Sequence, residues 1–266
     1  METKNKYQFK KKVAIDYPAD SFSEFECIMT WELATIIAES NSWKTTFALD
    51  MIERNSKKWI KGFYINLEFP IETMWQSRRL RFHWKTKKDL TTEGTLTDSE
   101  IADMERYINE NLNKFRYYNS PNWITLQKLE QIIEVAAMEG CQLFVVDTFS
   151  RIQGNLEKDA RNNQNKCMEE LQELAQRLNV AIVMLHHTNR AGTREGSQKI
   201  MDLSNVFIVI SKEQDAEGEE YRHYSLLKDK YVVMKEVDVY YYWGQYVKDW
   251  LPIWSYWGHR NTNKPF

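Results

Sequence analysis

The sequence predicts an α/β domain with a mostly parallel sheet, helices on both faces, and antiparallel strands at the C-terminal edge. Two observations lead to this prediction. Strand-like apolar runs alternate with stretches of helical spacing over the first two thirds of the chain. Three strand-like runs then follow one another between 206 and 242 at hairpin-like spacing. Alternating strands and helices are typical of parallel sheets, whereas consecutive strands are typical of antiparallel ones.

The order of the elements follows from apolar spacing and from turn and capping residues. The run 143–146 is wholly apolar, as in a buried parallel strand, and Pro70 interrupts an earlier strand-like run. Thr97 and Glu100 form a capping pattern at the start of a helix. The expected strands cover 32–38, 62–67, 115–119, 143–146, 181–185, 206–210, 221–227 and 237–242. The expected helices cover 44–54, 71–82, 97–113, 126–138 and 159–178, with a basic loop at 83–97.

Length and composition exclude several classes of protein. The chain has 266 residues, enough for one large α/β domain or two small ones, with 36 basic and 38 acidic residues, so DNA binding would need a local basic patch. It contains no run of 18 apolar residues, and the N-terminus lacks the apolar segment of a secretory signal, so we expect no membrane partner. Three widely spaced cysteines form neither a disulfide framework nor a zinc site. We therefore expect a cytoplasmic protein.

The segment between the first expected strand and helix is similar to a phosphate-binding loop, G-x-x-x-x-G-K-[ST]. That loop needs backbone N–H groups around phosphate, a lysine for the terminal phosphates and a hydroxyl for Mg²⁺. Lys44 and Thr45 supply the last two, but Ala38 and Trp43 stand at the glycine positions, so an ordinary strand–turn–helix remains an alternative. The candidate nucleotide-binding residues are Ser40, Asn41, Ser42, Trp43, Lys44, Thr45 and Thr46.

Two acidic residues follow expected parallel strands. Asp147 ends the apolar run 143–146, which is how P-loop ATPases present the aspartate that coordinates the metal. Glu68 follows the strand after the loop, and the carboxyl ends of parallel strands line one crevice. Lys44, Glu68 and Asp147 would then face one pocket. A turn or cap residue for Asp147 and a surface glutamate for Glu68 are the alternatives.

A histidine pair, His186 and His187, ends the expected strand 181–185. Adjacent residues of a strand point to opposite faces, so the two cannot easily bind one metal ion. One histidine at a strand end near phosphate is better interpreted as a residue that hydrogen-bonds the terminal phosphate.

Six segments in order resemble the RecA-like motor domain of hexameric replicative helicases of the DnaB type and of the plasmid RepA type, the latter having a His-His pair. They are ELATIIAESNSWKTTFALDM, FYINLEFP, LFVVDTFSRI, LNVAIVMLHHTNR, REGSQKIMDLSNVFIVISKE and LLKDKYVV. The resemblance covers about residues 20–245, without room for the N-terminal domain of DnaB. It implies a RecA-like P-loop NTPase core at 21–245, after a lead-in at 1–20 and before an aromatic tail at 246–266.

The resemblance also implies roles for individual residues. Lys44 would hold phosphate, Thr45 and Asp147 would hold Mg²⁺, and Glu68 would polarise the attacking water. His187 would take the place of the phosphate-sensing residue. ATP and Mg²⁺ are therefore the expected cofactors.

Further roles concern DNA and neighbouring subunits. Lys228 and Lys230 match a Lys-x-Arg element that reaches the neighbouring subunit's nucleotide, with lysine here in place of the arginine. Arg190, Arg194 and Lys199 lie in the loop 188–199 and would track single-stranded DNA in a central channel, although such a loop is more often simply solvated. The implied partners are single-stranded DNA, further copies of the chain in a hexamer, and a primase or helicase loader.

The leading hypothesis is an ATP-dependent DNA helicase or translocase. The alternatives are a degenerate, non-hydrolysing RecA-fold accessory protein, which the indole of Trp43 would favour, and a RecA-like repair ATPase.

Tryptophan occurs where glycine is expected. Average usage predicts about 19 glycines in a chain of this length, whereas there are 9 glycines and 10 tryptophans. Trp43 stands in the phosphate loop, and four others occupy turn or cap positions. We expect glycine in the living protein, from a UGA codon read with the wrong genetic code, at Trp31, Trp43, Trp59, Trp84 and Trp123. Trp75, on an apolar helix face, need not belong to this set. Genuine tryptophans in a degenerate protein are the alternative.

Overall fold

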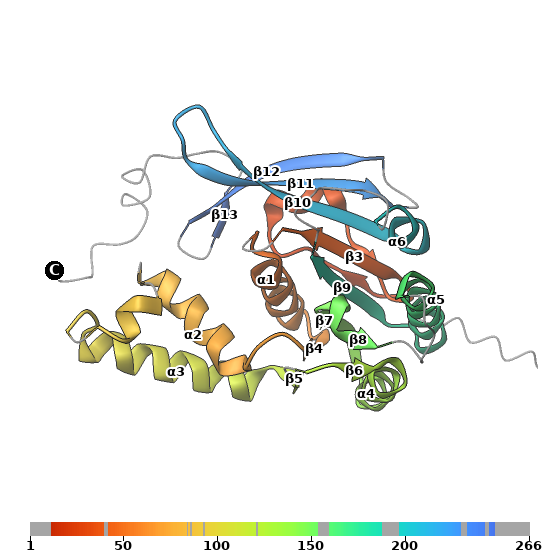
Figure 1. The fold of residues 1–266 in the computed structure, drawn as a ribbon, viewed down its shortest axis with the longest axis horizontal. Helices are drawn as coiled ribbons and strands as arrows, with labels where there is room; N and C mark the ends of the chain where they lie inside the picture. Colours follow the sequence, from red (N-terminus) through yellow and green to blue (C-terminus); the bar gives the residue numbers. More distant parts are fainter. Residues whose placement is uncertain are drawn as a thin grey trace, which may run out of the picture.

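The computed structural model is an α/β fold built on one nine-stranded sheet (Figure 1). It describes residues 12–39, 42–83, 85, 87–92, 94–120, 122–153, 160–187, 197–229, 233–242 and 245–247. The sheet consists of β3 (Leu33–Ala38), β4 (Lys61–Asn66), β5 (Arg116–Asn119), β7 (Cys141–Asp147), β9 (Ala181–His187), β10 (Val206–Gln214), β11 (Glu220–Lys228), β12 (Lys235–Tyr242) and β13 (Gln245–Val247). The helices are α1 (Lys44–Ser56), α2 (Ile71–Phe82), α3 (Asp98–Lys114), α4 (Leu126–Met138), α5 (Ala160–Leu178) and α6 (Ser197–Leu203).

The strand order confirms the predicted fold class. The order is β13-β12-β11-β10-β3-β9-β7-β4-β5, and every pair from β10 to β5 is parallel. The three pairs from β10 to β13 are antiparallel hairpins. The strands β3, β9, β7 and β4 are adjacent, so their carboxyl ends lie side by side at one edge.

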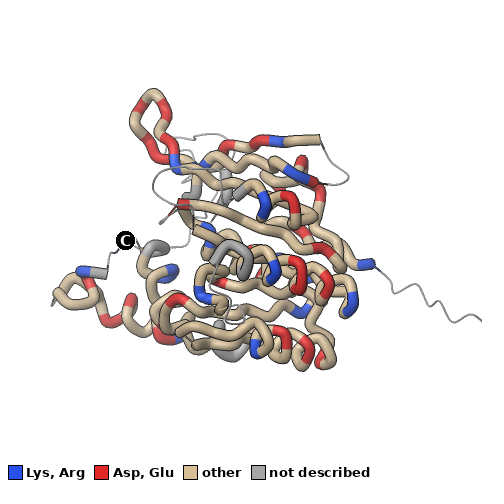
Figure 2. Tube along the Cα trace, turned by 45° about the vertical axis from the view of Figure 1, so that its right-hand side comes forward, with Lys and Arg blue, Asp and Glu red and all other residues tan. Residues whose placement is uncertain are grey.

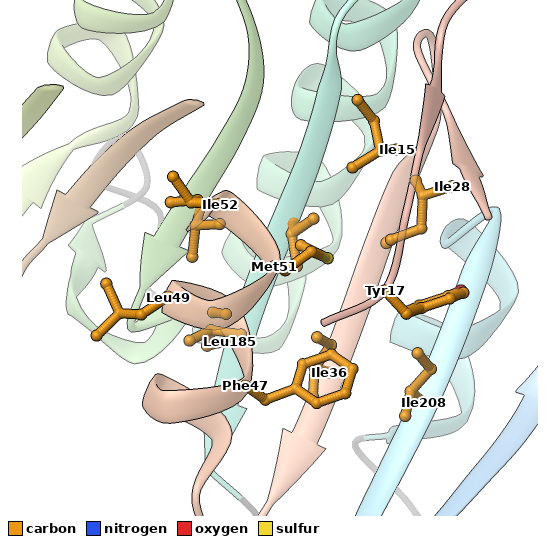
Figure 3. Close-up of a cluster of buried hydrophobic side chains, with 14 of the residues drawn as sticks. Ile15, Tyr17, Ile28, Ile36, Phe47, Leu49, Met51, Ile52, Leu185 and Ile208 are labelled. Carbon is orange, nitrogen blue, oxygen red and sulfur yellow. The ribbon is translucent and has the colours of Figure 1, made fainter. Parts of the chain in front are cut away.

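Side chains of the central strands alternate between two hydrophobic cores, because successive strand residues point to opposite faces. In β7, Leu143 and Val145 pack with α1, whereas Phe144 and Val146 pack with α4 and α5. Figure 3 shows the first core, where α1 lies across β3, β9 and β10. All four β7 side chains have no exposed surface, which explains the wholly apolar run in the sequence.

The segment before β3 packs against the first core. It contains β1 (Ala14–Ile15), β2 (Ile28–Met29) and a 3-10 helix, Asp20–Phe25. Ile15, Tyr17 and Phe22 are almost fully buried, and the Phe22 ring lies 5.1 Å from that of Phe47 in α1. Residues on both sides of position 21, where we expected the domain to begin, therefore contribute to the core.

Helices α2 and α3 form a pair that extends beyond β5 in Figure 1. The predicted cap of α3 is present, since Glu100 N–H donates to Thr97 Oγ1 at 3.2 Å and Thr97 N–H donates to Glu100 Oε2 at 2.8 Å. Trp75 of α2 is 1% exposed and stacks on Phe115 at 5.2 Å. Trp75 is thus a packed core residue, as its place on an apolar helix face predicted.

The structure adds short elements that the sequence did not predict. A 3-10 helix, Lys87–Leu90, interrupts the basic stretch at 83–97, and α6 occupies the end of the expected loop at 188–199. β6 (Ile124–Thr125) and β8 (Ile152–Gln153) pair as a separate two-stranded sheet, and Phe149–Arg151 form another 3-10 helix. Elements of two to seven residues carry too few apolar repeats for a periodic signal.

Replacing Phe47 by alanine should destabilise the domain. Phe47 has no exposed surface and also stacks on Tyr224 of β11 at 5.4 Å, so truncation leaves a cavity between α1 and the sheet. We expect a loss of about 3–5 kcal/mol in the free energy of unfolding, measured by urea denaturation. Val135→Ala, at a 54% exposed position of α4, is the control and should change stability by about 0.5 kcal/mol or less. Similar losses for both variants would contradict this packing.

Candidate functional site

The candidate site is a cavity of about 650 Å³ beside the start of α1, at the carboxyl edge of the parallel strands. Its walls come from the first turn of α1, the segment after β4, the end of β9, helix α2 and the antiparallel strands. Lys44, Thr45, Glu68 and His187 all line it. In a parallel sheet, this edge is where ligands bind, because several strand ends and a helix N-terminus meet there.

Lys44 is the first residue of α1 and is only 5% exposed. Its Nζ lies 3.1 Å from each of the His187 ring nitrogens, Nδ1 and Nε2. Burying an ammonium group without an anionic partner is costly. The position of Lys44 therefore suits a site that accepts an anion.

Asp147 ends β7 and is fully buried. Its Oδ2 accepts hydrogen bonds from Thr45 Oγ1 and from Tyr64 Oη, both at 2.6 Å. Burial raises the pKa of the Asp147 carboxyl, partly offset by Lys44 and these hydroxyls. Its other oxygen, Oδ1, has no hydrogen-bond partner among the described residues.

The donor set fits a divalent cation with a polyphosphate. A hydroxyl and a carboxylate oxygen are ligands that Mg²⁺ prefers, and the unpaired Oδ1 of Asp147 is an orphaned buried acceptor. Lys44 adds a positive charge one position from Thr45. The described residues contain no cluster of three or more metal-binding side chains. That is consistent with Mg²⁺, which takes one or two protein ligands together with phosphates and waters.

Glu68 follows β4 and faces the same cavity. Its Oε1 lies 3.3 Å from His187 Nε2. The hydrogen bond from His187 and the charge of Lys44 lower the pKa of Glu68 despite its partial burial. Lys44, Glu68 and His187 thus form one contiguous group. The topology argument placed Lys44, Glu68 and Asp147 in one pocket; Lys44 and Glu68 do line the cavity, whereas Asp147 is fully buried and reaches it only through its hydrogen bond with Thr45.

The two histidines point to opposite sides, as strand geometry predicted. His187 faces Lys44 and Glu68, whereas the His186 ring packs edge-on against Phe149 at 5.4 Å. Burial, with the charges of His187 and Lys44, lowers the pKa of His186 to about 4. His186 is therefore neutral near pH 7 and packs against Phe149, a residue of the second core.

Two site residues were missed by sequence reasoning. Tyr64 of β4 is 1% exposed and hydrogen-bonds Asp147. Arg222 of β11 is also 1% exposed, is bonded to Glu220 at 2.6 Å, and places its guanidinium 4.0 Å from the Trp43 ring centroid. A possible signal for Arg222 was alternation, which puts it on the same strand face as the buried Tyr224. Nothing local marked Tyr64 as more than a core aromatic.

Some of the other candidate residues lie beside the site and others lie away from it. Ser42 and Thr46 are buried beside Lys44. Lys228 does not line the cavity and donates to the carbonyls of Met201 and Asp202 at the end of α6. Lys199 lies in α6 rather than in a loop, since the chain is already helical from Ser197. The remaining candidates lie outside the described residues: Ser40, Asn41, Arg190, Arg194 and Lys230.

Comparison with protein families is decisive. A sequence model described as "DnaB-like helicase C terminal domain" matches residues 25–218. The chain belongs to the DnaB-like helicase C-terminal domain family. Comparison with curated proteins gives no match.

Solved structures agree with the RecA-like P-loop ATPase fold of this family. A structure described as an ATPase domain superposes with a TM-score of 0.72 at 13% identity, covering 88% of this chain and 92% of that one. A DnaB-like replicative helicase, in a structure that describes its interactions with primase, gives 0.69 at 12% identity, covering 82% and 57%. A KaiC-like protein from the archaeon Pyrococcus horikoshii OT3 gives 0.60 at 14% identity, covering 89% and 98%. At these identities the superpositions show a shared fold.

Charge and hydropathy add two observations. Figure 2 shows acidic and basic residues interspersed along the described chain. Within the part of the chain that the structure describes, no helix has the length and apolar character needed to cross a membrane.

Lowering the pH from 7 to 5 should destabilise the domain through His186. The unfolded histidine has a pKa of about 6.5 and the folded one about 4, so between these values mainly the unfolded state gains a proton. The stability that this group contributes is present above about pH 6.5 and is lost as the pH falls. We expect this group to contribute a loss of about 2 kcal/mol between pH 7 and 5. Urea denaturation at both pH values should show a smaller loss in His186→Gln, and equal losses would contradict the assignment.

Proposed function

We propose that this chain is an ATP-dependent DNA helicase or translocase motor that hydrolyses ATP and moves on single-stranded DNA. The observation that carries the proposal is the convergence of Lys44, Glu68 and His187 beside the Thr45–Asp147 pair. Membership of the DnaB-like helicase C-terminal domain family supports it. Localisation in the cytoplasm and a motor core at 21–245 are part of the same proposal.

Each residue has a role that its surroundings permit. Lys44 binds the terminal phosphates, and Thr45 with Asp147 holds Mg²⁺, which supplies charge neutralisation when it is bound with ATP. Glu68 has a lowered pKa, so its carboxylate is ionised near pH 7 and orients the attacking water. His187 bridges Lys44 and Glu68 and senses whether the terminal phosphate is present. Arg222, on the antiparallel strands, adds a cation to the wall of the phosphate cavity.

The assembly is proposed to be a hexamer with nucleotide between subunits. In the hexamer, Lys228 and Lys230 act on the nucleotide of the neighbouring subunit. In the single chain, the Lys228 ammonium group donates to the carbonyls of Met201 and Asp202 at the end of α6. Arg190, Arg194 and Lys199 face DNA in the central channel, where repeated positive charges track a strand without sequence preference. A primase or a helicase loader is a further proposed partner.

The experiment that tests the proposal measures ATP hydrolysis with and without single-stranded DNA. It should be done with the printed sequence and with Trp43→Gly, because an indole in the phosphate loop opposes phosphate binding. We expect DNA-stimulated hydrolysis from Trp43→Gly. If neither chain hydrolyses ATP but one binds Mg-ATP, the non-hydrolysing accessory protein becomes the better assignment. If neither binds nucleotide, the motor function is wrong.

Lys44→Ala, made in the Trp43→Gly chain, should weaken Mg-ATP binding and abolish hydrolysis. It removes the buried ammonium group that would contact phosphate, and such charged contacts contribute about 10–100-fold in affinity. Titration with a fluorescent ATP analogue measures the change. Lys61→Ala is the control, because Lys61 lies at the opposite end of β4 on Glu139. Unchanged affinity in Lys44→Ala would remove Lys44 from the site.

Glu68→Gln, in the same chain, should retain nucleotide binding but lose turnover. The amide keeps the size of the side chain but cannot accept a proton from water, and such general-base groups contribute about 10²–10⁴-fold in rate. Steady-state hydrolysis and nucleotide titration on the same samples separate the two effects. Normal turnover would show that Glu68 has a different role.

A further inference from the structure

Three tryptophans occupy backbone conformations that are typical of glycine. Trp31, Trp43 and Trp59 have φ values of +86°, +65° and +64°. In this region the Cβ atom of an L-residue crowds the backbone, so glycine dominates and bulky residues are outliers. They are three of the five tryptophans that the structure describes. The other described residues with positive φ are Glu26, Asn179, Gly94, Gly140 and Gly218.

Trp59 occupies the position after a helix where glycine is usual. Ile60 N–H donates to Asn55 O at 3.2 Å and Trp59 N–H donates to Ser56 O at 3.1 Å, the two bonds of a Schellman motif. That motif needs a left-handed residue at the position of Trp59. The indole is 92% exposed, so packing does not compensate for the conformation.

The same junction occurs twice more in this sheet with residues that suit it. Between α4 and β7 the left-handed residue is Gly140, whose N–H donates to Ala137 O at 2.9 Å. Between α5 and β9 it is Asn179, followed by a bond from Val180 N–H to Ala175 O at 3.1 Å. Glycine and asparagine are the two residues that favour this position. Of these three helix-to-strand junctions, the one after α1 alone carries tryptophan.

Trp31 lies in a tight turn of another kind. Glu32 N–H donates to Met29 O at 3.1 Å, which makes Trp31 the third residue of a four-residue turn between β2 and β3. Its φ of +86° is that of the third residue in a type II turn, where glycine or asparagine is usual.

Trp43 is the residue before Lys44, with φ +65° and ψ +16°. Its indole lines the cavity of the candidate site and lies against Arg222. A glycine would allow the backbone to approach an anion and would leave this part of the cavity open.

We propose that positions 31, 43 and 59 are glycine in the living protein, encoded by UGA codons that the source organism translates as glycine. A single codon reassignment accounts for three unrelated turns and for part of the shortage of glycine beside an excess of tryptophan. Trp75 is genuine, since it is helical and fills the core. Trp123 does not have a positive φ, so the proposal does not include position 123. Trp84 lies outside the described residues. The proposal for positions 31 and 59 is independent of the proposed function. The proposal for position 43 rests on that function, because this residue lies in the proposed phosphate loop.

The gene and the native protein give the direct test. We expect UGA at codons 31, 43 and 59 and UGG at codon 75. The tryptic peptide 13–44 from source cells contains positions 31 and 43. Its mass should be lower than that of the tryptophan-containing peptide by two differences between tryptophan and glycine. UGG at the three codons, or a peptide with the mass expected for tryptophan at positions 31 and 43, would overturn the proposal.

Recombinant variants test the backbone argument separately. Trp59→Gly should raise the melting temperature by about 2–4 °C, whereas Trp59→Ala should give no such gain because alanine keeps the Cβ. Trp75→Gly is the matched control and should lower the melting temperature by about 10 °C. An equal effect of glycine and alanine at position 59 would contradict the argument.

Nucleotide binding then separates this proposal from the proposed function. Trp43→Gly should bind a fluorescent ATP analogue at least about tenfold more tightly than Trp43→Ala, since only glycine favours this conformation. UGA codons with no nucleotide binding by Trp43→Gly would leave the glycine assignment standing and overturn the motor function. Equal binding by Trp43→Gly and Trp43→Ala would overturn the requirement for glycine at position 43.

Discussion

The site depends on the buried carboxylate of Asp147, which connects three elements of the fold. It ends β7, accepts a hydrogen bond from Thr45 in α1, and accepts another from Tyr64 in β4. These bonds fix the first turn of α1 against the sheet edge, and with it the direction of Lys44. A carboxylate with no exposed surface is costly to bury unless its oxygens are paired. One oxygen has two partners and the other has none among the described residues, so the same group is both a structural anchor and an acceptor available to a cation.

The histidine pair shows how one strand can serve a core and a site at once. Alternation along β9 sends His186 toward Phe149 and His187 toward Lys44 and Glu68. Burial lowers the pKa of the first and keeps it neutral, while the second joins two groups of opposite charge. The arrangement requires the strand to continue to its last residue in register with β3, where Ala38 pairs with His187. A shift of one residue would exchange the two histidines.

The turns impose a second constraint, which is independent of the chemistry. After α1, α4 and α5 the chain reverses into the next strand within a few residues, and the bonds that end these three helices require a left-handed residue there. The sequence meets that requirement after α4 and α5 but conflicts with it after α1. The conflict recurs in the turn before β3 and in the loop before α1. Local sequence and global fold normally agree in natural proteins, so a conflict that recurs at three tryptophans points to the identity of those residues.

The sequence alone determined the fold class, the order of the main helices and strands, and the grouping of Lys44, Glu68, Asp147 and His187 at one sheet edge. Apolar periodicity and chain order carry this information, because parallel topology brings strand ends together. Tertiary structure alone decided the contributions of Tyr64 and Arg222, the helical position of Lys199 and the packing of Ile15 and Tyr17 on the core. These depend on contacts between residues far apart in sequence. The backbone angle at each tryptophan also came only from the fold, because φ is set by the hydrogen bonds that close a turn.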